Sequence, residues 1–262
     1  MVEIMGPESA WPATIWVMAA VAVLLASALQ AATGAGLGLI AGPVLLLAMQ
    51  SSGAIHVAVI LNLALSLALL PSERHELPDG PLTWLSAGAI LGLPLGAVAL
   101  RLAPLSALEL AAGFAVTLGG VQLLLAIRRP RRAGATSDSP LGLGGFGLLS
   151  GMMTAALAIP GPAALWGLGR TSLTTPEIRA VLRAFFVIAY TLTLVILAAL
   201  GMDWGVVLEV TAWMLPALVV GGAAGVYIKA RIGELALRKA FIVLLIAMGI
   251  ALLLNSGSRL FG

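Results

Sequence analysis

The residues best placed to do chemistry in this sequence are glycine, threonine and proline inside apolar stretches, and they occur twice. Residues 33–43 read TGAGLGLIAGP and residues 151–162 read GMMTAALAIPGP. Glycine and proline interrupt helices, and an interrupted helix leaves backbone N–H and C=O groups without partners. In hydrocarbon such groups are tolerated only where protein or a water-filled cavity receives them. Two facing breaks therefore predict a polar pocket lined by backbone groups.

The helix dipole indicates which ligand such a pocket prefers. Half-helix starts expose amides with partial positive charge, so they favour an anion without a buried lysine or arginine. The hydroxyl groups of Thr33 and Thr154 are expected to add donors. Glycine at positions 34, 36 and 161 lets the backbone approach a ligand closely. These two threonines and the three glycines, Gly34, Gly36 and Gly161, are assigned to substrate binding, together with Pro43, Pro160 and Pro162. An open alternative is that proline and glycine only kink packed helices.

Polar side chains within the apolar stretches complete the predicted substrate-binding site. Gln30 stands just before the first break, and Asn62 and Ser66 are one turn apart on a shared helix face. Tyr190 follows Arg183 by seven residues, nearly two turns, and continues its face. The structural alternatives are helix-to-helix hydrogen bonds for Asn62 and Ser66, and anchoring at the membrane surface for Arg183. No catalytic residue, cofactor or metal is expected, since the chain has two histidines and no cysteine.

The elements that must position these residues are membrane-spanning helices. The chain of 262 residues is 61% hydrophobic and 10% charged, with a mean hydropathy of +1.10. A spanning helix needs about 20 apolar residues, and several such windows occur. Continuous runs such as FFVIAYTLTLVILAAL favour helices over the alternating pattern of a β-barrel. The predicted fold class is an all-α integral membrane protein with about eight to ten helical segments.

The predicted segments follow the same order in two halves. In the first, helices are expected near 13–32, 54–70, 81–101 and 106–127, with a short piece at 36–49. In the second they are expected near 141–158, 177–200, 204–229 and 236–255, with a short piece at 160–169. The Arg-, Pro- and Ser-containing linker 128–140 separates a first repeat, 1–127, from a second, 141–262. Sliding 91–125 onto 220–254 also aligns two Gly-xxx-Gly patterns.

Charge predicts how the halves are oriented. Four arginines in the linker indicate a cytoplasmic segment, while the acidic start of the chain indicates an external N-terminus. Counting spans from the linker, the first half begins outside and the second begins inside, so the repeats are predicted to be inverted. Each repeat would open with a broken or re-entrant helix. Short Gly/Pro-interrupted segments at matching places in inverted halves are typical of a transporter's binding site.

Several longer stretches also resemble a known family. They are GAGLGLIAGPVLLL at 34–47, IPGPAALWGL at 159–168, RTSLTTPEIRAVLRAFFV at 170–187 and the Gly-xxx-Gly helix with its closing helix at 87–125. In these the chain is similar to the TauE/SafE sulfite exporter family of bacterial anion transporters. Family members usually carry a run of consecutive glycines, whereas here Gly34, Gly36 and Gly38 are separated by alanine and leucine.

The resemblance implies an exporter of sulfite, an organosulfonate or a related small anion in the bacterial inner membrane. Alternating access around a midplane site is the expected mechanism. The expected partners are the small anion and the lipid bilayer, with a homodimer left open and no nucleic acid. The alternatives are a membrane scaffold or sensor without flux, or an intramembrane lipid-pyrophosphate phosphatase. The phosphatase would need paired carboxylates, whereas Glu109 and Glu209 are isolated in the sequence.

Overall fold

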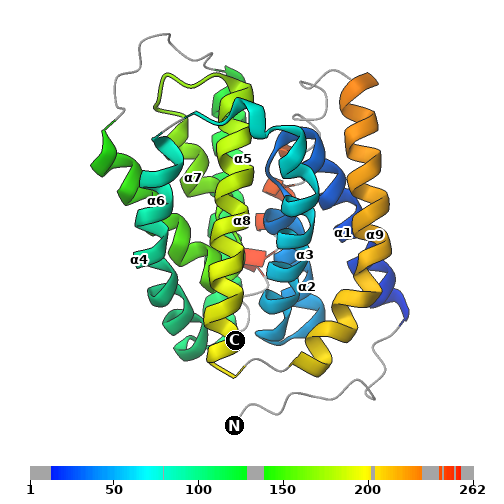
Figure 1. The fold of residues 1–262 in the computed structure, drawn as a ribbon. Helices are drawn as coiled ribbons and strands as arrows, with labels where there is room; N and C mark the ends of the chain where they lie inside the picture. The colour runs from blue at the N-terminus through cyan, green and yellow to red at the C-terminus, as the bar shows by residue number, and fades with distance from the viewer. Residues whose placement is uncertain are drawn as a thin grey trace.

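The chain folds into a bundle of helices (Figure 1). The computed structural model describes residues 13–78, 80–128, 139–201, 204–231, 242–243, 245–250 and 252–254. Within these ranges there is no strand, and seven helices are long and apolar enough to cross a membrane. The prediction of an all-α, multi-pass membrane protein is therefore confirmed.

The helices begin and end close to the predicted positions. The first part of the chain forms α1 (Ala13–Thr33), α2 (Leu37–Met49), α3 (Gly53–Leu69), the short 3-10 turns η1 (Leu70–Ser72) and η2 (Arg74–Glu76), α4 (Pro81–Leu102) and α5 (Leu105–Arg128). The second part forms α6 (Pro140–Leu157), α7 (Gly161–Leu168), α8 (Thr175–Ala199) and α9 (Trp204–Arg231). Most of the predicted linker, 129–138, and much of the predicted helix 236–255 lie outside the described residues.

Both predicted breaks are present, and each has a local cause. Between α1 and α2, Gly34 and Gly36 have φ angles of 93° and 153°, which side-chain-bearing residues rarely adopt. Between α6 and α7 the turn is made by Ala158, with φ of 58°, whose amide donates to the carbonyl of Thr154 at 2.8 Å. Pro160 and Pro162 then flank the start of α7, where a missing N–H costs little. The two short helices, α2 and α7, thus each follow a sharp turn.

A very close helix crossing joins α4 to α6. At Gly92 and Gly96 of α4, an added Cβ would overlap the backbone carbonyl oxygens of Leu148 and Met152 in α6. Any side chain at either glycine would therefore push the two helices apart. In lipid, where apolar burial gives little drive for helix association, small residues that allow such contact are a main source of packing energy.

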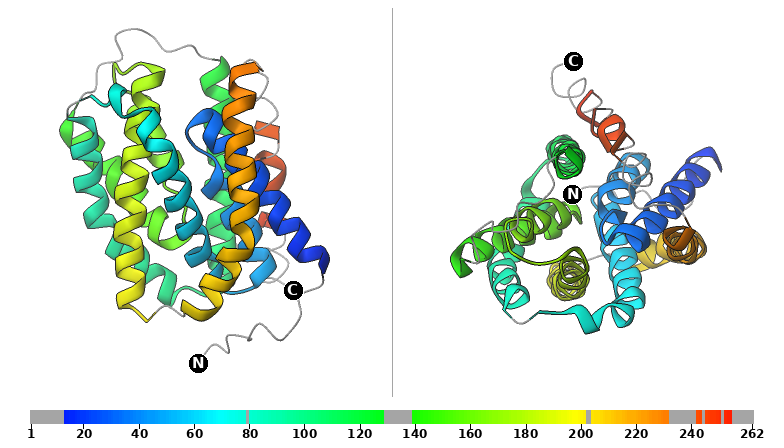
Figure 2. Two further views of the ribbon diagram at one scale, coloured as in Figure 1. Left: turned by 45° about the vertical axis from the view of Figure 1, so that its right-hand side comes forward. Right: turned by 90° about the horizontal axis from the view of Figure 1, so that it is seen from above.

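A second crossing of the same kind joins α9 to α1. Gly221 and Gly225 of α9 lie against the carbonyl oxygens of Leu24 and Ala28 in α1. Each of the two glycine helices, α4 and α9, thus packs on the helix that leads into the break of the other half. In the view from above, α1, α2, α3 and α9 gather on one side and α4, α6, α7 and α8 on the other (Figure 2). These two groups are called the α1–α3/α9 body and the α4/α6–α8 body below.

Leucine at Gly92 is expected to destabilise the protein, because its Cβ alone would overlap the Leu148 carbonyl. Overpacking of this kind typically costs about 1–3 kcal/mol. The free energy of unfolding in detergent, followed by denaturant titration, measures the loss. Gly145→Leu on α6 is the matched control, since nothing lies within 4 Å of a Cβ there. Equal stability of the two variants would contradict the proposed role of the crossing.

Three segments meet at one end of the bundle. The η1–η2 segment after α3, the start of α8 and the end of α9 lie together at the top of Figure 1. Ion pairs from Glu73 to Arg179, Arg183 and Lys229 hold them there. On the outer faces of the bundle, large apolar side chains such as Leu91 and Val219 are more than half exposed, as expected of surfaces that face lipid.

Candidate functional site

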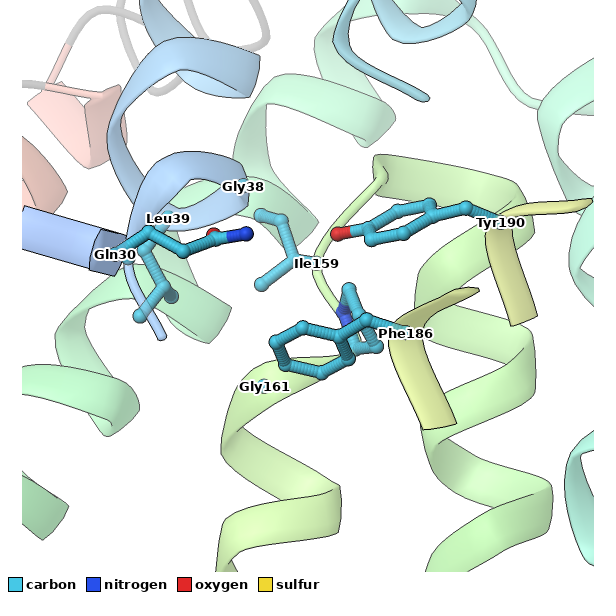
Figure 3. A pocket seen from close by; sticks show the side chains of 9 residues that line it. Gln30, Gly38, Leu39, Ile159, Gly161, Phe186 and Tyr190 are labelled. Carbon is cyan, nitrogen blue, oxygen red and sulfur yellow. The ribbon is translucent and has the colours of Figure 1, made fainter. Parts of the chain in front are cut away.

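A small cavity lies where the two breaks meet (Figure 3). Gln30, Gly36, Gly38 and Leu39 line it from the first break, Ile159, Pro160 and Gly161 from the second, and Phe186 and Tyr190 from α8. Its volume is about 10 Å³. A cavity needs about 10–15 Å³ to hold one water molecule, so the described conformation is nearly closed and must widen to admit an anion.

Five of the predicted site residues are brought together in the lining of this cavity: Gln30, Gly36, Pro160, Gly161 and Tyr190. They come from α1, the two breaks and α8, which are far apart in the sequence. Gln30 and Tyr190 point toward one another from opposite sides of the cavity (Figure 3). The lining therefore combines a side-chain amide, a phenol and backbone at helix starts.

Gln30 is the residue that connects the first break to the rest of the site. Its Oε1 accepts the Leu37 amide, the first of α2, at 2.9 Å, and its Nε2 donates to Oγ of Ser66 at 3.4 Å. The side chain is buried. The start of α2 is thus partly capped by Gln30, which corrects the expectation of wholly unpaired amides. The amide of Leu39 donates to the Gly36 carbonyl. Of the first three amides of α2, only that of Gly38 is therefore left without an acceptor within the helix start.

The start of α7 is more open than that of α2. Its N-cap residue, Pro160, offers no side-chain acceptor, and Pro162 has no N–H. Helix geometry leaves the amides of Gly161 and Ala163 without an intrahelical acceptor. The Pro160 carbonyl accepts the amide of Ala164, at 3.3 Å, and the hydroxyl of Ser150, at 2.7 Å. Of Gly161 and Ala163 only Gly161 lines the cavity, so the backbone donor nearest to it from the start of α7 is the Gly161 amide.

Tyr190 and Gly38 bring the two breaks into contact. The phenol of Tyr190 donates to the carbonyl oxygen of Ala158, the residue at the turn of the second break, at 3.1 Å. Gly38, in the first turn of α2, lies so close that an added Cβ would overlap the same carbonyl and stand 3.2 Å from the Tyr190 hydroxyl. One carbonyl thus joins α2, α8 and the second break at the edge of the cavity.

Thr33 and Thr154 do not line the cavity, although both were assigned to it from the sequence. The hydroxyl of Thr33 lies 2.9 Å from the carbonyl of Leu29 and 2.8 Å from that of Ala35. The hydroxyl of Thr154 donates to Ser150, one turn earlier in α6, at 2.6 Å. These hydroxyls satisfy helix carbonyls beside the breaks, a common alternative for threonine in helices.

Other predicted residues surround the cavity without lining it. Asn62 is fully buried and its Nδ2 donates to Ala58, while Ser66 serves as the acceptor for Gln30. Pro43 is buried within α2 and Pro162 packs toward Gly119 of α5.

Arg183 and Gly34 belong to the end of the bundle above the cavity. The guanidinium of Arg183 is 3% exposed and donates to the carbonyls of Ala31, at 3.1 Å, and Leu69, at 3.2 Å. These carbonyls are at the C-terminal ends of α1 and α3, where the helix dipole attracts a cation. Gly34 lies under the aliphatic part of Arg179. Arg183 therefore ties the two helix ends together rather than lining the cavity.

Four lining residues were missed in the sequence: Gly38, Leu39, Ile159 and Phe186. They are apolar, and nothing in an apolar helix marks one such residue as facing a cavity. Phe186 could have been found from its position between Arg183 and Tyr190 on α8, since the three share a helix face. Its ring packs edge-on against Tyr190, with centroids 5.9 Å apart.

The cavity has no charged side chain in its lining. Among the described residues, no group of three or more His, Cys, Asp and Glu side chains could hold a metal ion. Binding at this place would depend on dipoles: backbone amides at two helix starts and the second N–H of the Gln30 amide, since Tyr190 donates its one proton to Ala158. Backbone amides at a helix start attract negatively charged groups.

Comparison with known proteins gives one family match. The family model described as Sulfite exporter TauE/SafE matches residues 19–252, which include both breaks and every residue that lines the cavity. No curated protein and no solved structure matches the chain.

Proposed function

Because the chain belongs to the TauE/SafE sulfite exporter family, we propose that it exports sulfite, an organosulfonate or a related small anion through the cavity between the two breaks. The observation that carries this proposal is the meeting of two helix starts at one small cavity without a charged side chain. A transporter must bind its anion and also release it, and dipoles hold an anion less tightly than a buried arginine would.

Alternating access is the mechanism we infer, and the packing supports it. One glycine crossing joins α1 to α9 in the α1–α3/α9 body and another joins α4 to α6 in the α4/α6–α8 body, while α8 packs against both α3 and α4. The cavity lies between residues of both: Gln30 and Gly38 from the first, Gly161 and Tyr190 from the second. Rocking of one body against the other would open the cavity to each side of the membrane in turn.

The two bodies also agree with two inverted repeats, 1–127 and 141–262. Both repeats would contribute a broken opening helix, and each would give one helix, α4 or α9, to the body of the other. Gly92 and Gly96 in the sequence alignment of the halves correspond to Gly221 and Gly225, and all four make the same kind of contact. This correspondence favours a true repeat over two independent packing sites.

The proposed orientation places the end with α8's start and α9's end in the cytoplasm. Arg179, Lys229 and Arg231 lie at this end, in agreement with the positive-inside rule. In a bacterial inner membrane with a negative interior, the potential favours exit of an anion by about 2.3 kcal/mol per charge per 100 mV. Export therefore needs no coupling ion.

Flux into proteoliposomes tests the proposal directly. Purified protein is reconstituted into vesicles that enclose a sulfite-reactive dye, and sulfite is added outside. Sulfoacetate, thiosulfate, acetate and phosphate are added with it as competitors. We expect sulfite flux well above that of empty liposomes, driven by an imposed potential, and competition by the organosulfonate or thiosulfate. Absence of flux, together with absence of thermal stabilisation by any of these anions, would favour a scaffold instead.

A further inference from the structure

A cluster of four charged side chains lies at the proposed cytoplasmic end, outside the cavity described above. Glu73 of the η1–η2 segment pairs with Arg183 at 3.1 Å, Lys229 at 3.5 Å and Arg179 at 3.6 Å. Three cations thus surround one carboxylate, and no other ion pair of theirs is present in the part of the chain that the structure describes. The cluster carries an excess of positive charge that an anion could neutralise.

The pairing within this cluster is loose. Charge-assisted N–H···O contacts are usually about 2.7–2.9 Å, shorter than any of the three here. The Nε atoms of Arg179 and Arg183 are buried and have no hydrogen-bond partner, and Arg183 as a whole is 3% exposed. A carboxylate has two oxygens, and Glu73 Oε1 is shared by Arg179 and Lys229 while Oε2 faces Arg183. Buried donors therefore stay unsatisfied with Glu73 as the acceptor.

The cluster stands on the way to the cavity. Arg179, Arg183, Phe186 and Tyr190 follow one another along one face of α8, and the last two line the cavity. The aliphatic part of Arg179 covers Gly34 at the first break. The side chains of Arg179, Glu73 and Lys229 are 15%, 12% and 36% exposed, so water reaches the cluster. An anion that comes from this end meets the cluster before the cavity.

We propose that Arg179, Arg183 and Lys229 form a second anion site, which Glu73 occupies in the described structure and which a small oxyanion takes by displacing Glu73. A group such as sulfite or a sulfonate presents three oxygens, one for each cation. Glu73 is then a built-in competitor that keeps the site filled when no anion is present.

Displacement of Glu73 would also change the contacts between the two bodies. Glu73 and Lys229 belong to the α1–α3/α9 body, whereas Arg179 and Arg183 belong to the α4/α6–α8 body. The carboxylate thus joins the two bodies at this end, and its release would remove one link between them, while the hydrogen bonds from Arg183 to Ala31 and Leu69 remain. This consequence depends on the proposed transport function, but the anion site itself does not.

The decisive variant is Glu73→Gln, compared with Glu76→Gln. Both substitutions remove one negative charge from the same segment, but Glu76 is exposed and no ion pair joins it to the cluster. The probes are sulfate and sulfite, titrated into purified full-length protein at constant ionic strength with gluconate as the background anion. The readout is the half-saturating concentration for thermal stabilisation.

We expect Glu73→Gln to bind the anions at least about tenfold more tightly than the unaltered protein, because the site is no longer filled by its own carboxylate. Glu76→Gln should change the half-saturating concentration by less than about twofold, since exposed charges act weakly. An unchanged affinity in Glu73→Gln, or an equal gain in both variants, would overturn the proposal.

A second pair of variants covers the case in which Glu73→Gln does not fold. Lys229 is the most exposed of the three cations, and Lys229→Gln leaves Glu73 paired with both arginines. It should weaken the stabilisation by sulfate several-fold, whereas Arg231→Gln, two residues on, should not. Arg231 lies over the ring of Tyr227 and forms no ion pair with Glu73. Equal effects of the two substitutions would contradict the second site.

Repeating the titrations in Gly161→Val separates the two proposals. That substitution is designed to fill the cavity, so anion binding that persists there belongs to the cluster. If the unaltered protein transports the anion and Glu73→Gln leaves anion binding unchanged, the second site alone is rejected. Binding at the cluster in a protein that shows no flux would reject the transport function alone.

Discussion

Alanine at Gly38 is expected to reduce anion flux by about 10- to 100-fold, because a 1 Å misplacement of positioning groups can have an effect of this size. The added Cβ would overlap the Ala158 carbonyl and crowd the Tyr190 hydroxyl, so α2 and the second break must move apart. The cavity then loses the geometry in which both helix starts face one ligand. A stability loss of about 1–3 kcal/mol should accompany the change.

Gly42→Ala is the matched control for this experiment. It makes the same substitution one turn later in α2, where the nearest atom, the Leu157 carbonyl oxygen, is 3.4 Å from an added Cβ. Flux in proteoliposomes and the thermal midpoint are measured for both variants. Normal flux in Gly38→Ala would show that the close approach of the two breaks is not needed for transport. Equal loss in both variants would point to a general weakening of α2.

Valine at Gly161 is expected to abolish flux for a different reason, because its side chain would fill the cavity itself. Here an added Cβ has ordinary space, with Ala35 Cβ and the Phe186 ring both 3.9 Å away, and the backbone is not in the left-handed region. The two methyl groups of valine would instead occupy the cavity that Gly161 lines. Because Gly161 is buried and the cavity volume is about 10 Å³, we expect overpacking to lower the free energy of unfolding by about 1–3 kcal/mol.

A graded series makes the test of Gly161 sharper. Gly161→Ala should leave partial flux, because it adds one methyl group, whereas Gly161→Val should leave none above empty liposomes. Gly145→Val on α6, where nothing lies within 4 Å of a Cβ, should transport normally. Full flux in Gly161→Val, with the protein correctly inserted, would move the transport pathway away from this cavity.

The local features of the fold could be read from the sequence because their causes are local. Mean hydropathy and the length of apolar runs predict spanning helices wherever the chain is placed in space. The first break needs glycine because Gly34 and Gly36 adopt positive φ angles, and the start of α7 tolerates Pro160 and Pro162 because helix starts do not use every N–H. The same reasoning placed Gly36, Pro160 and Gly161, which line the cavity.

The tertiary structure decided which polar groups face the cavity and which are used elsewhere. Thr33 and Thr154 are donors of the expected kind, but their hydroxyls donate to carbonyls in their own helices. Gln30 caps α2 and reaches Ser66, 36 residues away, a partner that no spacing rule predicts. Arg183 is buried because the ends of α1 and α3 meet beside it.

The sequence by itself therefore determined the membrane setting, the helices and the two breaks, since propensity, hydropathy and backbone freedom act over a few residues. Only the tertiary structure placed α4 on α6 and α9 on α1, brought Gly38 against Ala158 and gathered three cations around Glu73. Those contacts join residues that are far apart in the chain. Their free energy depends on distances that exist only after the helices have packed.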